Sequence, residues 1–73
     1  MNFLDRLILE HKELAEKTNT LSMFLVSNTY DNLDYIQQQL LMRQLKAMKE
    51  YKSILEARVE HINSMIELDN GSN

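Results

Sequence analysis

The chain is 73 residues long, contains no cysteine and carries a net charge of −3 with a pI near 5.2. A domain of this size buries only about 60% of its unfolded surface, and because disulfides and thiolate-bound metals are excluded, association is the natural way to bury more. The acidic balance argues against a general nucleic-acid binder, and the lack of a membrane-length apolar run or a signal-peptide pattern predicts a cytoplasmic location.

The first predicted element is a helix over residues 3–26. The chain has no proline, and its only glycine is Gly71, so long helices are permitted almost everywhere. Asn2 is placed to cap the helix, with the acid Asp5 in its first turn. A set made mostly of leucines then recurs in steps of three and four, the spacing of a helix that packs on another helix: Leu4, Leu7, His11, Leu14, Thr18, Leu21 and Leu25.

A polar connection over residues 27–33 separates this helix from a second one. Its Ser, Asn and Asp side chains compete with helical hydrogen bonds. Asp34 followed by Gln37 resembles a capping box, so a second helix is predicted over residues 34–68, with residues 69–73 as a disordered tail. The second helix repeats the three-and-four spacing: Leu41, Leu45, Met48, Lys52, Leu55, Val59, Ile62 and Ile66.

These elements predict an all-α fold, a single domain of residues 1–68 that forms an antiparallel two-helix hairpin with a longer second helix. Folding back about the connection places Phe3 near Arg58. The same arithmetic places His11 near Glu50. Four apolar residues then lie beyond the end of the first helix without intramolecular cover: Ile62, Met65, Ile66 and Leu68.

The uncovered apolar surface predicts a homo-oligomeric helical bundle. Residues 43–52 are mainly basic and residues 56–69 mainly acidic, which favours an antiparallel pairing of second helices over a parallel one. The residues predicted to form the oligomer interface are Leu40, Tyr51, Ile54, Val59, Ile62, Met65 and Ile66.

The stretch "QQQLLMRQLKAMKEY", residues 37–51, has two interpretations. In one, its cations belong to the self-complementary helix surface. In the other, Arg43 and Lys46 hold a phosphate, and Tyr30 and Tyr35 offer flat surfaces to a nucleobase. The sequence leaves both open.

Catalytic chemistry is not indicated. The only histidines, His11 and His61, lack a second metal ligand at helical spacing. There is no glycine-rich phosphate loop and no context for a nucleophile elbow. The sequence therefore predicts a protein that is not an enzyme, with no catalytic residue, no metal and no cofactor.

Two patterns in the chain resemble a family of small phage proteins that includes members from crAss-like phages. The family patterns are "E..EL..K...L..FL" and "LL..QL.AM..Y...L..R". The matching residues here are Glu10, Glu13, Leu14, Lys17, Leu21, Phe24 and Leu25, then Tyr30 and Leu33, then Leu40, Leu41, Gln44, Leu45, Ala47, Met48, Tyr51, Leu55 and Arg58. In size and hairpin plan the family is similar to phage anti-defence sponges, oligomers that sequester cyclic nucleotide immune signals.

Three functions follow as hypotheses. The resemblance implies a phage anti-defence protein in the bacterial host cytoplasm, acting as an oligomeric sponge for a cyclic nucleotide. The alternatives are an inhibitor that binds a host defence protein, and a structural assembly module with no small ligand.

Overall fold

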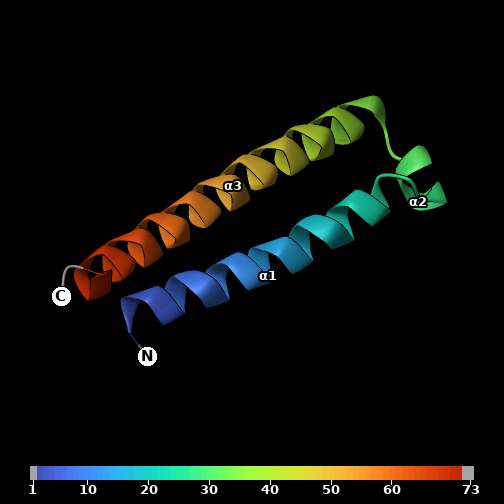
Figure 1. The fold of residues 1–73 in the computed structure, drawn as a ribbon. Coiled ribbons are helices and arrows are strands. Elements are labelled where there is room, and N and C mark those ends of the chain that lie inside the picture. The colour runs from blue at the N-terminus through green and yellow to red at the C-terminus, as the bar shows by residue number, and fades with distance from the viewer. Residues whose placement is uncertain (1, 72–73) are drawn as a thin grey trace.

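A computed structural model describes residues 2–71, with side chains as far as Glu67. It contains α1 (Phe3–Phe24), α2 (Asn28–Asp31) and α3 (Tyr35–Gly71), and no strand within the described range. Figure 1 shows α1 and α3 side by side and antiparallel, with α2 at the end where the chain reverses. The molecule is a rod of 60 × 19 × 16 Å. The predicted all-α hairpin with a longer second helix is confirmed.

Helix α1 is bounded by side-chain hydrogen bonds at both ends. At its start, Oδ1 of Asn2 accepts a hydrogen bond from the backbone N–H of Asp5 at 2.8 Å, the arrangement of an N-cap. At its end, the hydroxyl of Ser27 donates to the carbonyl of Phe24 at 2.6 Å. The backbone of Ser27 is extended, with φ −91° and ψ 159°, so the helical conformation does not continue through it. Helix α1 ends at Phe24, two residues before the predicted boundary.

The connection is more ordered than the predicted loop, because it contains the short helix α2. Oγ of Ser27 accepts from the backbone N–H of Tyr30 at 3.2 Å and caps this helix. The ring of Tyr30 meets the ring of Phe24 edge-on, with centroids 6.3 Å apart. Its hydroxyl donates to the carbonyl of Gln38 at 3.2 Å, and the Gln38 amide donates to the Tyr30 carbonyl at 2.9 Å. Tyr30 therefore ties α1, α2 and α3 together.

Helix α3 begins after Asp34, whose Oδ1 accepts from the N–H of Gln37 at 2.9 Å, as the capping-box spacing indicated. It continues to Gly71, three residues beyond the predicted end. Residues 69–71 of the expected disordered tail are helical, because nothing before Gly71 breaks a helix and Gly71 does not adopt a positive φ. Residues 72–73 of that tail lie outside the described residues.

The core is a short cluster between α1 and α3. Leu7, Leu14 and Leu55 are buried, and three partly buried side chains pack against them: Met48, Val59 and Ile62. The hydroxyl of buried Thr18 donates to the carbonyl of Leu14 at 2.7 Å, so no unpaired polar group enters the core there. Each buried leucine contributes about 1.5–3 kcal/mol, which is modest for a whole domain.

Of the two contacts predicted between the long helices, the one at the start of α1 is present and the one further along α1 is wrong. The Arg58 guanidinium lies over the Phe3 ring, 5.7 Å from its centroid, as the folding arithmetic predicted. His11, however, pairs with Glu56 at 2.8 Å and not with Glu50. At 100° per residue, Glu50 and Glu56 lie about 120° apart around α3. Glu56 therefore faces the flank that carries His11, and Glu50 faces away from α1.

The expectation that four residues lack intramolecular cover needs one correction. Ile62 packs against the core of its own chain and is partly buried. Met65 and Ile66 are 53% and 45% exposed, in agreement with α3 outrunning α1. The side chain of Leu68, the fourth, lies outside the described residues.

Candidate functional site

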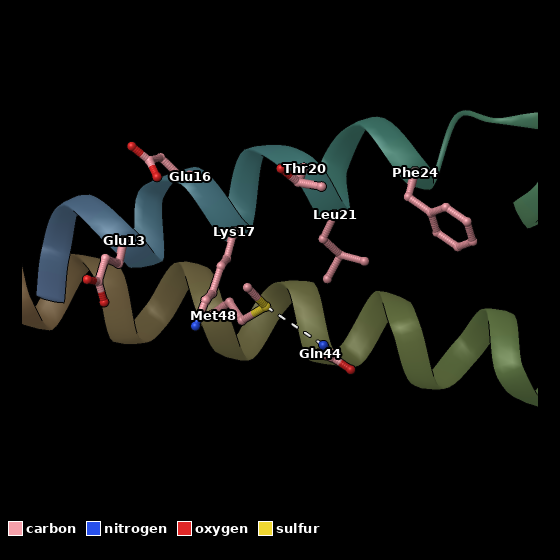
Figure 2. A pocket seen from close by; sticks show the side chains of 8 residues that line it. All are labelled: Glu13, Glu16, Lys17, Thr20, Leu21, Phe24, Gln44 and Met48. Carbon is pink, nitrogen blue, oxygen red and sulfur yellow. Dashed lines mark hydrogen bonds between the residues drawn. The ribbon is translucent and has the colours of Figure 1, made fainter.

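A groove of about 600 Å³, here called the larger groove, lies between the middle of α1 and the first half of α3. Figure 2 shows Leu21 directed toward α3, while Glu16 and Thr20 point away from it along the rim. Its lining residues are Glu13, Glu16, Lys17, Thr20, Leu21, Phe24, Gln44 and Met48.

The chemistry of this larger groove is mixed. Leu21, Phe24 and Met48 give it an apolar floor, and the ring of Phe24 is fixed by its contact with Tyr30. Two carboxylates face one ammonium group among the lining residues, so the groove carries a net negative charge. It therefore suits a ligand that presents hydrogen-bond donors better than one that carries several phosphates.

Another groove, here called the lysine groove, lies on the opposite flank of the hairpin. It encloses about 340 Å³ and is lined by Leu25, Met42, Leu45, Lys46 and Lys49. On α3, Lys46 of this groove and Gln44 of the larger groove lie about 160° apart. Its apolar side chains form a floor flanked by two cations, with no acid among the lining residues. This combination suits an anionic ligand with a flat apolar part.

The four residues predicted to bind a ligand are not brought together in one groove. Lys46 lines the lysine groove, and Arg43 is not among its lining residues. Tyr35 is 72% exposed at the start of α3. Tyr30 is partly buried, and its hydroxyl and ring are both used within the hairpin.

Lys49 is the residue that sequence reasoning left out of the candidate site. It lies one turn after Lys46, and both lysines are exposed. Arg43 is also one turn from Lys46. Spacing along α3 alone therefore did not show whether Lys46 shares a groove with Arg43 or with Lys49. The deciding feature is Leu25 at the end of α1, which supplies the groove's other wall.

The predicted oligomer interface divides into two groups. Val59 and Ile62 contact the chain's own core. The remaining predicted residues are exposed by 43–53%, and they are Leu40, Tyr51, Ile54, Met65 and Ile66. Tyr51 also donates its hydroxyl hydrogen bond to Glu10 of α1, which fixes the position of its ring.

One pair of titratable side chains in the hairpin is His11 and Glu56, on a flank groove shared with Ile8, Val59 and Glu60. The hydrogen bond from the His11 imidazole lowers the pKa of Glu56 from its usual value of 4.5, against the opposing effect of desolvation, and the charges of His11 and Lys52 lower it further. Among residues 2–71, no three His, Cys, Asp or Glu side chains gather into a possible metal site. None of the described helices combines the length and apolarity needed to cross a membrane.

Comparison with known families gives a match that covers most of the hairpin. The family is Sequestin, whose model matches residues 1–61. This range takes in α1, α2, both grooves and the core residue Leu55. Comparison with curated proteins gave no match, and neither did comparison with solved structures. Because the match spans well over half of its length, the chain belongs to the Sequestin family.

Proposed function

We propose that this protein binds and sequesters a small anionic nucleotide, a cyclic nucleotide signal of bacterial immunity, as a phage anti-defence protein. The family name denotes sequestration, which is a binding function. The observation that carries the nucleotide proposal is the lysine groove, where two cations flank an apolar floor without an opposing acid in the lining.

The lysine groove fits the two chemical parts of a nucleotide. Lys46 and Lys49 lie one turn apart on α3, so both ammonium groups reach a phosphate held at the groove's edge. Leu25, Met42 and Leu45 then contact the face of the base, which is the more apolar part of the ligand. Binding this way holds the ligand without altering it, since neither lysine is paired with a base or nucleophile in the groove.

Sequestration works by mass action, so it requires affinity and abundance but no turnover. A sponge lowers the concentration of free signal until little remains for the host receptor. In an oligomer of this small chain, each subunit contributes its own groove, so one assembly binds several ligands. The oligomeric state is part of the proposal, supported by the exposed apolar residues of α3.

A pull-down from a nucleotide pool tests this function. Purified protein is incubated with a mixture of cyclic di- and trinucleotides, washed, and denatured, and the released small molecules are identified by mass spectrometry. We expect one class of cyclic nucleotide to be released chemically unchanged. Release of a hydrolysed product would contradict sequestration, and release of no nucleotide would favour the alternative of an inhibitor that binds a host protein.

A further inference from the structure

An exposed stripe along α3, beside the face that packs on α1, has the pattern of a second helix-packing seam. Its inner edge borders α1, where the Tyr51 hydroxyl donates to Glu10 and the Arg58 guanidinium lies over the Phe3 ring. Leu40, Tyr51, Ile54 and Met65 on the stripe are 47%, 43%, 50% and 53% exposed. Four further exposed residues complete the spacing. In order, this outer stripe is Leu40, Gln44, Ala47, Tyr51, Ile54, Arg58, His61 and Met65.

The steps along the outer stripe alternate four and three residues, which keeps one face of a helix in line over about seven turns. Hydrophobic residues stand at both ends and at the centre. Large exposed apolar side chains at such regular positions are unusual on a helix that faces only water. The stripe therefore calls for a partner surface of matching length and chemistry.

We propose that the partner is a second copy of this chain, with the two α3 helices antiparallel about a two-fold axis between Lys52 and Ser53. In this register, the two residue numbers of every facing pair have the same sum. Leu40 faces the partner's Met65, and Tyr51 faces the partner's Ile54. Gln44 faces the partner's His61, and Ala47 faces the partner's Arg58.

The residue types favour this register over its neighbours. Apolar residues meet apolar residues, the amide meets the imidazole, and small Ala47 leaves room for the Arg58 side chain. A shift of one heptad in one direction sets Leu40 against the partner's Arg58. A shift in the other direction sets Ile54 against the partner's Arg58 and Tyr51 against the partner's His61. Both shifts place cationic or polar groups on apolar ones and shorten the overlap.

Charge complementarity supports the same pairing. Arg58 is the one residue of the outer stripe that carries a permanent charge. In the proposed register it lies within one turn of the partner's Glu50, which projects on the free flank of α3 away from α1. By symmetry this contact occurs twice. A parallel pair would instead set Arg58 against the partner's Arg58.

The pairing also has a consequence for the larger groove. Gln44 lines that groove, and in the proposed dimer it faces the partner's His61, with the partner's Arg58 at the adjacent Ala47. The partner thus brings the imidazole of His61 and the cationic Arg58 to the edge of a groove whose own charge is negative. The pairing involves the outer stripe of α3 and does not depend on the proposed ligand.

Disulfide trapping tests the register directly, because the native chain has no cysteine. Leu40→Cys and Met65→Cys are purified separately, mixed under refolding conditions and oxidised. We expect a covalent dimer with one chain of each variant, identified by intact mass. Each variant alone should stay uncrosslinked, because in this register identical residues are separated by about 37 Å along the helix axis.

Matched controls make the outcome decisive. Met42 is 51% exposed but lies about 160° around α3 from Leu40, so Met42→Cys with Met65→Cys should give no dimer. In sedimentation, Ile54→Asp should convert the wild-type dimer to a helical monomer while Met42→Asp leaves it dimeric, with circular dichroism confirming that both fold. A dimer from Leu40→Cys alone, a missing mixed dimer, or a monomeric folded wild type would each overturn the proposal.

Discussion

Nε2 of His11 lies 2.8 Å from Oε1 of Glu56 and joins residues that are 45 positions apart in the chain. The ionised carboxylate accepts this hydrogen bond, which is why the pKa of Glu56 is lowered. A group whose pKa is lower in the folded than in the unfolded state adds stability above the unfolded value. That contribution is lost as the pH falls through the folded value.

The first prediction follows from this pair. Thermal stability should fall as the pH is lowered through and below 4.5, the usual value for Glu56, and Glu56→Gln should remove part of that dependence. Thermal unfolding followed by circular dichroism across the pH range measures both. Glu67→Gln, at the far end of α3, is the control. An equal flattening by both variants would show that overall charge, and not the His11 contact, sets the dependence.

The second prediction concerns the core. Leu55 is fully buried, so Leu55→Ala should lower the free energy of unfolding by about 2–5 kcal/mol through lost burial and the cavity left behind. Ile36→Ala is the matched control, because Ile36 is 69% exposed. Urea titration monitored by helicity gives both values. Similar losses from the two variants would contradict the assignment of Leu55 to the centre of the hairpin.

The third prediction separates a structural role of Tyr30 from a ligand-binding one. Tyr30→Phe keeps the edge-on contact with Phe24 but removes the hydroxyl hydrogen bond to Gln38. We expect a loss of about 0.5–1.5 kcal/mol in stability and no change in nucleotide affinity. Unchanged stability together with weakened binding would return Tyr30 to the ligand site.

Much of the hairpin followed from the sequence because its signals are local. The capping pairs Asn2 with Asp5 and Asp34 with Gln37 each span three residues, and both form as predicted. The heptad spacing predicted the face on which Leu7, Leu14 and Leu55 are buried. These features depend on helix geometry and on few distant contacts.

The contacts that the sequence did not reveal depend on how α1 and α3 are rotated about their own axes, which decides the flank on which each side chain lies. The partner of His11 was wrong by six residues, because counting back from the connection fixes height along α3 and ignores the flank on which a side chain lies. The pairing of Lys46 with Lys49 was missed for a similar reason. It becomes visible only when Leu25 of α1 closes the groove beside them. The short helix α2 was not predicted from the sequence, because the residues that cap it also favour turns.

The role of the lysine groove is tested by single substitutions with matched controls. Lys46→Ala and Lys49→Ala should each weaken nucleotide binding by about ten- to hundredfold, since a charge-assisted contact contributes about 1.5–3 kcal/mol. Lys12→Ala, an exposed lysine of α1 that lines neither groove, should bind like the wild type. Arg43→Ala should also retain affinity, because Arg43 is not part of the groove lining.

The most direct test of the sequestration proposal is isothermal titration calorimetry of cyclic di- and trinucleotides into the wild-type protein and these variants. We predict saturable binding of one nucleotide class, weakened by Lys46→Ala and Lys49→Ala and unaffected by Lys12→Ala. The account would be contradicted by the absence of heat from every nucleotide in the panel, or by wild-type affinity in both lysine-groove variants.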